Sequence, residues 1–127
     1  MTDTSLAGKN ILYVEDNEAS RHLMEIVFEE MGCSLVAVAS AQEALVKIQA
    51  DKFDLVLTDI RMPQMNGYEL ARVIRQTDAQ VPIYALTAHV MEYVPMKCQD
   101  AGMNGFITKP IQIEEFKRTI KTYFGIS

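Results

Sequence analysis

The sequence lacks the features that mark secreted and membrane-spanning chains. Its only two cysteines, Cys33 and Cys98, do not form a C-x-x-C pair, which is typical of free, buried thiols in a reducing cytosol. No apolar run approaches the roughly 18 residues of a membrane span, and residues 1–10 have neither the basic start nor the apolar run of a signal peptide. We therefore expect a soluble, cytoplasmic domain that makes no membrane contact of its own.

Basic residues are also in the minority, with 12 Lys and Arg against 17 Asp and Glu and a net charge of −5. Binding to a nucleic-acid backbone needs clustered Lys and Arg, so we expect this domain to bind no nucleic acid. The 127 residues are 49% hydrophobic, which is ordinary for a globular protein and enough for one domain with a good core. We expect a flexible N-terminal segment over residues 1–9 and a single domain over residues 10–125.

Short apolar runs alternate with helical patterns along the chain. The runs predict strands at residues 10–14, 34–39, 53–58, 81–86 and 105–108. Between and after them, apolar residues at helical spacing predict helices at 17–31, 40–48, 66–74, 95–101 and 113–124. This alternation, with its short connections, predicts an α/β fold: a doubly wound, flavodoxin-like (βα)5 domain whose parallel sheet has the strand order 2-1-3-4-5.

Local signals predict how several of these helices begin, end and pack. Asn17 is the expected N-cap of the first helix, and Gly32 its C-terminal stop. Ser40 and Glu43 are spaced for a capping box at the start of the second helix, and Pro95 fits best as the first residue of the fourth. The first helix is expected to bury an apolar stripe that recurs every four residues: Ala19, Leu23, Val27 and Met31.

Acidic side chains stand at the ends of two strands that the predicted order makes neighbours. Glu15 and Asp16 follow the first strand, and Asp59 follows the third. Because open α/β sheets bind ligands where such strand ends meet, we expect the carboxylates to share one site. Like charges this close repel, so one group would carry a proton or the cluster would bind a cation. Few, hard oxygen ligands favour Mg²⁺, with Mn²⁺ and Ca²⁺ as alternatives. The simpler interpretation is that each acid only caps a helix.

The two remaining strand ends add a hydroxyl and an amine. Thr87 ends the fourth strand, and Lys109 follows the fifth, from where its ammonium could reach back towards the carboxylates. Each is weak evidence alone, since a Thr there is more often a helix cap and a Lys a solvated turn residue. Around one carboxylate, however, a metal ion, an ammonium and a hydroxyl suit phosphoryl transfer with the carboxylate as nucleophile.

Together these residues resemble the functional residues of response-regulator receiver domains of two-component phosphorelays, over essentially the whole chain. The matching positions are Glu15-Asp16, Asp59 with Met62, Pro63 and Gly67 in D-x-x-M-P-x-x-x-G, Thr87-Ala88 and Lys109-Pro110. The resemblance implies that Asp59 is a phosphoacceptor that takes its phosphoryl group from a phosphohistidine. It also implies that Asp16 ligates Mg²⁺ directly, that Glu15 acts through water and that Arg61 offers its backbone carbonyl to the metal.

The same resemblance implies roles for the side chains around the phosphoacceptor. Lys109 would contact the carboxylate and then the phosphoryl group, while Thr87 would bond the phosphoryl group and act as the switch. Phe106 matches the switch aromatic, which turns inward when Thr87 moves and here has no hydroxyl. Arg61 and His89 would flank the attacking water and tune the lifetime of the phosphoryl group. The expected chemistry is self-catalysed phosphotransfer and autodephosphorylation, which switch the surface of the fourth helix, fifth strand and fifth helix.

Local segments are similar to the receiver modules of hybrid sensor histidine kinases: residues 14–17, 85–89, 101–104 with Cys98, and 108–111. Such a module, part of the cytoplasmic portion of a membrane-anchored kinase, takes phosphate from a histidine kinase. It passes the phosphate to a histidine-phosphotransfer domain that docks at the first helix, where His22 and Ile26 lie on the expected exposed face. The alternative is a stand-alone response regulator that acts by protein–protein binding. A homodimer through the switch surface is compatible with either.

Three other classes fit the residues less well. A phosphatase of the haloacid-dehalogenase type typically has a second Asp two residues after its nucleophile as general acid, whereas this chain has Arg61. A flavodoxin would bind its flavin phosphate on a loop rich in Ser, Thr and Gly, where this chain has Glu15-Asp16-Asn17. A degenerate receiver used only for binding would usually have lost Asp59, Lys109 or one acid of the pair.

Overall fold

A computed structural model of the chain describes residues 6–88 and 93–125. Within these ranges, five parallel strands form one sheet in the order β2-β1-β3-β4-β5. The strands are β1 (Asn10–Val14), β2 (Ser34–Val38), β3 (Leu55–Asp59), β4 (Ile83–Thr87) and β5 (Gly105–Thr108). The predicted fold class and strand order are confirmed.

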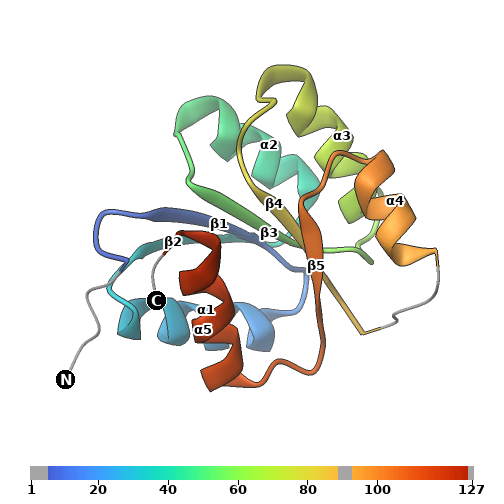
Figure 1. Cartoon of the computed structure of the whole chain (residues 1–127). Helices are drawn as coiled ribbons and strands as arrows, with labels where there is room; N and C mark the ends of the chain where they lie inside the picture. Colours follow the sequence, from blue (N-terminus) through green and yellow to red (C-terminus); the bar gives the residue numbers. More distant parts are fainter. Residues whose placement is uncertain (1–5, 89–92, 126–127) are drawn as a thin grey trace.

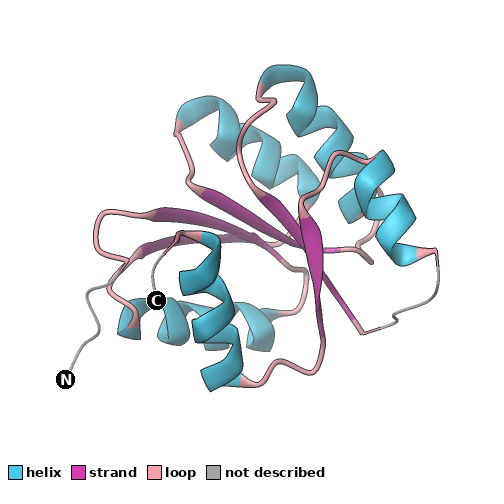
Figure 2. Ribbon diagram, in the orientation of Figure 1, coloured by secondary structure: helices cyan, strands magenta, loops and turns pink. Residues whose placement is uncertain are grey.

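Helices cover both faces of this sheet. They are α1 (Glu18–Glu30), α2 (Ala41–Ala50), α3 (Gly67–Thr77), α4 (Val94–Asp100) and α5 (Ile113–Tyr123). Helices α1 and α5 lie on one face, and α2, α3 and α4 lie on the other, as Figure 1 and the colouring of Figure 2 show. None of the helices in the described ranges is long and apolar enough to cross a membrane.

Each face of the sheet has its own apolar core, which we name after the helices that cover it. Successive strand residues alternate between the two, so that Leu12 faces the α2–α4 core and Tyr13 faces the α1–α5 core. In the α1–α5 core the rings of Phe28 and Phe116 meet edge to face, with centroids 5.8 Å apart. Burial on both faces explains why the central strands appear in the sequence as near-continuous apolar runs.

The predicted buried stripe of α1 is half wrong. Val27 and Met31 are buried, but Ala19 is exposed and Leu23 is 42% exposed. Four residues turn an α-helix by about 400°, so a strict four-residue repeat drifts by about 40° per step and leaves the buried face. The residues that α1 buries instead mix spacings of one, three and four: Met24, Val27 and Phe28.

The helix caps are largely as predicted. Asn17 caps α1, and Gly32 after it has a φ of +78°, which favours glycine. At α2, the Glu43 N–H donates to Ser40 Oγ at 3.2 Å. The Glu43 carboxylate, however, accepts from the N–H of Ala39 at 2.7 Å, one residue before the position that a capping box uses. The predicted box therefore forms in one half only.

Two strands extend one residue further than predicted, which positions the site. Asp59 is the last residue of β3 and Thr87 the last residue of β4, so both side chains project from the sheet itself. Helix α4 begins at Val94, one residue before the predicted Pro95. The strand end fixes the backbone of Asp59 more firmly than a loop would, because its neighbours are held by ladder hydrogen bonds.

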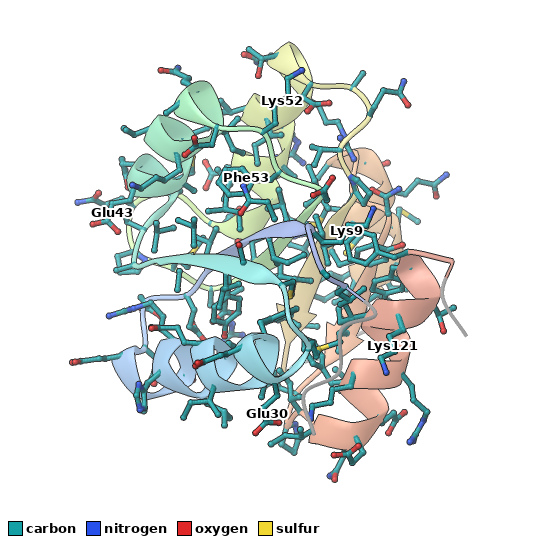
Figure 3. The ribbon with its side chains drawn as sticks, turned by 90° about the vertical axis from the view of Figure 1, so that its left-hand side faces the viewer. Lys9, Glu30, Glu43, Lys52, Phe53 and Lys121 are labelled. Atoms are coloured by element: carbon teal, nitrogen blue, oxygen red, sulfur yellow. The ribbon has the colours of Figure 1, made fainter. Side chains whose placement is uncertain are left out.

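Residues before β1 also pack on the domain. Leu6 is fully buried in the α1–α5 core. The Nζ atom of Lys9, labelled in Figure 3, lies 5.3 Å from the centroid of the Phe124 ring at the end of α5. The expected division between residues 1–9 and 10–125 stays a prediction, with Leu6 already part of the folded core.

Candidate functional site

The register of the sheet gathers three carboxylates at one edge. Val14 of β1 pairs with Thr58 of β3, so Glu15 and Asp16 emerge beside Asp59. Carboxylate oxygens of these three residues lie within 4.8 Å of one another. Carboxylate oxygens this close together favour a hard divalent cation. The residues thus form a candidate metal site at the strand ends, where the sequence predicted one.

Lys109 reaches the cluster from the end of β5, two strands away from β3. Its ammonium donates to Glu15 Oε1 at 2.8 Å and to Asp59 Oδ2 at 3.2 Å. Partial burial favours the neutral amine, but hydrogen bonds and charge interactions with the two carboxylates outweigh it and raise the pKa of Lys109. The lysine therefore stays charged and bridges the two acids.

Glu15 is the most deeply buried acid of the cluster, with 2% of the residue exposed. One of its oxygens, Oε2, is buried without a hydrogen-bond partner among the described residues. Burial raises the pKa of Glu15 to about 7, and the Asp59 carboxyl adds to the rise while Lys109 opposes it. A buried acid with an unpaired oxygen indicates a site that is completed by a proton or a cation.

The loop after β3 needs glycine at its end. A Cβ atom on Gly67 would collide with the backbone carbonyl of Asp59 and would lie 3.0 Å from the Cα atom of Ile60. The N–H of Gly67 instead donates to the Ile60 carbonyl at 2.9 Å. Asn66 and Glu69 then form a complete capping box, which fixes the start of α3 against the site. The glycine of the sequence motif is thus explained by close backbone approach.

Thr87 lies beside the cluster and opens onto a separate cleft of about 550 Å³. It is 6% exposed and pairs with Thr108, the residue before Lys109. We call this space the β3–β4 cleft, because it begins at the ends of those two strands. The residues that line it are Ile60, Arg61, Met62, Pro63, Asn66, Tyr68, Thr87, Tyr93, Val94 and Lys97.

Three further residues, Arg61, Phe106 and His89, were predicted to belong to the site. Arg61 is exposed and lines the β3–β4 cleft. Phe106 is half-buried and packs against the α2–α4 core. His89 lies outside the described residues. The roles assigned to these three by resemblance stay predictions.

Sequence reasoning missed a groove on the α1 side of Lys109. It has a volume of about 280 Å³ and is lined by Tyr13, Ser20, Leu23, Met24, Lys109, Pro110 and Ile111. Leu23, which lines the groove, was expected in the core but is exposed. Ile26, on the same helix, is 43% exposed, as expected. The three-residue spacing of Leu23 and Ile26, which places them on one helix face, was the available signal.

Hydrogen bonds of Arg75 and Asn104 fix the chain between α4 and β5. Arg75 Nε donates to the Gly102 carbonyl at 2.7 Å, and Arg75 Nη2 donates to Asn104 Oδ1 at 3.0 Å. The same Asn104 oxygen accepts from the N–H of Ile83 at 2.9 Å. These bonds tie the end of α3 to the starts of β4 and β5, at the edge of the sheet away from the carboxylates.

A doubly wound domain with acids after β1 and at the end of β3, a hydroxyl at the end of β4 and a lysine after β5 has the groups that suit phosphoryl transfer at its strand ends. A family model, the response regulator receiver domain, matches residues 11–121. The chain therefore belongs to the receiver domain family of two-component systems. Receiver domains of this family interact with histidine kinases or phosphotransfer proteins.

Similar proteins include both kinases and free regulators. The chain is 38% identical over 94% of its length to the hybrid signal transduction histidine kinase L of Dictyostelium discoideum, but it spans only 7% of that protein. It is 31% identical over 92% of its length to the polar-differentiation response regulator DivK of Brucella anthropi, of which it covers 97%. Receiver domains of this kind thus occur both inside large kinases and as whole proteins.

One solved structure is similar in fold and in sequence. It is the receiver domain of the sensor histidine kinase PA1611 from Pseudomonas aeruginosa PAO1, with a magnesium ion coordinated in the active-site cleft. The TM-score is 0.84 and the identity 33%, over 94% of this chain and 99% of that one.

Proposed function

We propose that Asp59 is the phosphoacceptor of this receiver domain and takes its phosphoryl group from a phosphohistidine. The observation that supports this most directly is the position of Lys109, whose ammonium contacts both Asp59 and Glu15 within the carboxylate cluster. An acid that only capped a helix would need neither a second buried acid nor a lysine from a distant strand. The arrangement instead keeps one carboxylate beside groups that can neutralise a phosphoryl group.

The cluster suits Mg²⁺. Its donors are hard carboxylate oxygens from Glu15, Asp16 and Asp59, and the unpaired Oε2 of Glu15 leaves one buried acceptor to be satisfied. We assign Asp16 and Asp59 as direct ligands, Glu15 as a ligand through water and Arg61 as a donor of its backbone carbonyl; Mn²⁺ could substitute. When bound, the ion would neutralise the cluster and the phosphoryl oxygens that approach it.

The chain's own residues account for the transfer. A carboxylate oxygen of Asp59 attacks phosphorus, the P–N bond of the phosphohistidine breaks, and its electron pair remains on the imidazole nitrogen. Lys109 moves its hydrogen bond from the Asp59 carboxylate to a phosphoryl oxygen, and the Thr87 hydroxyl donates to another. Hydrolysis of the product reverses the modification, with Arg61 and His89 setting how readily water attacks.

The signal would pass through β4 and β5. Movement of Thr87 towards the phosphoryl group leaves space on the sheet edge that Phe106, half-buried against the α2–α4 core, can fill. Since Phe106 lacks a hydroxyl, its two positions differ in packing alone. The surface of α4, β5 and α5 would change with it and could serve a partner or a second copy of the chain.

We further propose that the domain belongs to a hybrid histidine kinase and relays phosphate to a histidine-phosphotransfer domain along α1. The exposed Leu23 and Ile26 support this, because they form an apolar area beside the groove that contains Lys109. The alternative is a stand-alone response regulator. The similarity to DivK, of which the chain covers 97%, supports this alternative.

Labelling with a small phosphodonor tests the assignment of Asp59. With Mg²⁺ and acetyl phosphate, the protein should gain one acid-stable, base-labile phosphoryl group. Asp59→Asn should gain none, and Asp16→Ala or excess chelator should suppress labelling of the wild-type chain. Normal labelling of Asp59→Asn would refute the phosphoacceptor, whereas undiminished labelling in chelator would refute the metal site.

A further inference from the structure

Among the described residues, the lining of the β3–β4 cleft carries a charge opposite to that of the whole domain. The chain has a net charge of −5, yet the described residues that line the cleft include two cations, Arg61 and Lys97, and no Asp or Glu. Ile60, Met62 and Val94 form an apolar part of its wall. Its volume of about 550 Å³ is within the range of small-molecule sites.

Lys97 is positioned at this cleft by two aromatic rings. Its Nζ lies 5.0 Å from the ring centroid of Tyr93 and 5.8 Å from that of Tyr68. Both distances allow cation–π attraction, which restricts a side chain that would otherwise be free on the surface of α4. Tyr68 is only 8% exposed, so at least one of the two rings is fixed by the core.

The cleft begins next to the proposed phosphoacceptor, because its lining includes Ile60, the residue after Asp59, and Thr87. Ile60 follows Asp59, and its N–H donates to the carbonyl of Leu86, the residue before Thr87, at 3.3 Å. A molecule in the cleft therefore contacts Ile60, directly after the end of β3, and Thr87 at the end of β4. It approaches from the side opposite to α1, where a protein donor would dock.

We propose that the β3–β4 cleft is a binding site for small acyl phosphates, in which Lys97 and Arg61 bind the carboxylate leaving group. This inference rests on the proposed role of Asp59. An Asp59 oxygen attacks phosphorus, the bond between phosphorus and the bridging oxygen breaks, and the electron pair leaves on that oxygen as a carboxylate. No proton or further reactant is needed, because one anhydride replaces another. Negative charge grows on the leaving group as the bond breaks, so a cation there stabilises the transition state more than the bound donor.

Lys97 is thus a specificity-determining residue that separates donors by their leaving groups. Acetyl phosphate releases an anionic acetate, whereas phosphoramidate releases neutral ammonia. Two unit charges about 4 Å apart in water interact by an energy equivalent to roughly a fivefold change in rate. The cation should therefore accelerate the first donor several-fold and the second much less.

The test compares second-order rate constants for phosphorylation of the full chain by these two donors at low ionic strength. Lys97→Gln should react with acetyl phosphate about 3- to 10-fold more slowly and with phosphoramidate less than twofold more slowly. The difference should shrink in about 0.5 M salt, since the cleft is open to solvent. Lys97→Arg should stay close to the wild-type rate with both donors.

Lys47→Gln is the matched control, because it removes the same charge from α2, away from the cleft. It should react with both donors at the wild-type rate. An unchanged acetyl phosphate rate in Lys97→Gln, or equal slowing with both donors, would overturn the inference while leaving Asp59 as phosphoacceptor. Absence of labelling at Asp59 in the wild-type chain would instead overturn the proposed function on which the inference rests.

Discussion

The ammonium of Lys109 donates a 2.8 Å hydrogen bond to the buried carboxylate of Glu15, across 94 residues of sequence. This bond is shorter than the 3.2 Å bond of the same ammonium to Asp59. Before any phosphoryl group arrives, the lysine therefore mainly compensates Glu15. A cation that neutralised Glu15 would release Lys109 for Asp59 and its phosphoryl group, which links metal binding to reactivity.

The raised pKa of Glu15 predicts an unusual pH dependence of stability. An acid whose pKa is higher in the folded state than in the unfolded state binds its proton more tightly when the protein is folded. The free energy of unfolding therefore falls as the pH rises from the unfolded-state pKa to the folded-state pKa. For Glu15 these are 4.5 and about 7. In chelator, Glu15→Gln should match the wild-type free energy of unfolding at pH 5 and exceed it at pH 8 by on the order of 1 kcal/mol.

Urea unfolding at the two pH values measures this difference. Glu25→Gln, which changes an exposed acid on α1, should keep the wild-type pH dependence. If Glu15→Gln is instead less stable than the wild type at pH 8, the carboxylate of Glu15 is ionised without strain and the account of its burial is wrong.

Gly67→Ala should destabilise the domain by roughly 2–4 kcal/mol, because its Cβ would press on the Asp59 carbonyl and force the β3–α3 loop apart. Gly8→Ala is the control: Gly8 has a φ of +84° and open space around it, so only the left-handed backbone costs stability there, by about 1 kcal/mol. Chemical denaturation of both variants gives the comparison. Equal losses would show that the contact with Asp59 is relieved without cost.

Leu23→Asp should separate the two phosphodonor routes. It places a charge in the proposed docking area on α1, so transfer from a phosphorylated histidine-phosphotransfer domain should slow about tenfold or more. Labelling by acetyl phosphate should not change. Val46→Asp, at a residue of α2 that is 66% exposed, is a matched control and should affect neither route. Equal transfer rates for all three proteins would remove α1 from the docking surface.

The strand order and the cluster could be predicted from the sequence because both depend on local pattern and on general rules of parallel sheets. Once the order is 2-1-3-4-5, Glu15 and Asp59 must meet. The rotation of α1 could not be predicted in the same way. It depends on which side chains fill the α1–α5 core, so the fully buried Met24 displaced Leu23 from the predicted stripe.

The β3–β4 cleft could not be predicted from the sequence either. Tyr68 and Lys97 belong to different helices, and their approach depends on how α3 and α4 pack, for which the sequence has no periodic signal. The burial of Glu15 was likewise invisible, since its neighbour Asp16 is exposed and both follow the same strand.

The location of the phosphoryl group tests the central claim most directly. Borohydride reduces an aspartyl phosphate to homoserine, so the protein is treated with Mg²⁺ and acetyl phosphate, reduced, digested and sequenced by mass spectrometry. We predict homoserine at position 59 alone, and none after treatment in excess chelator. Homoserine at position 16, or at any carboxylate other than Asp59, would contradict the account.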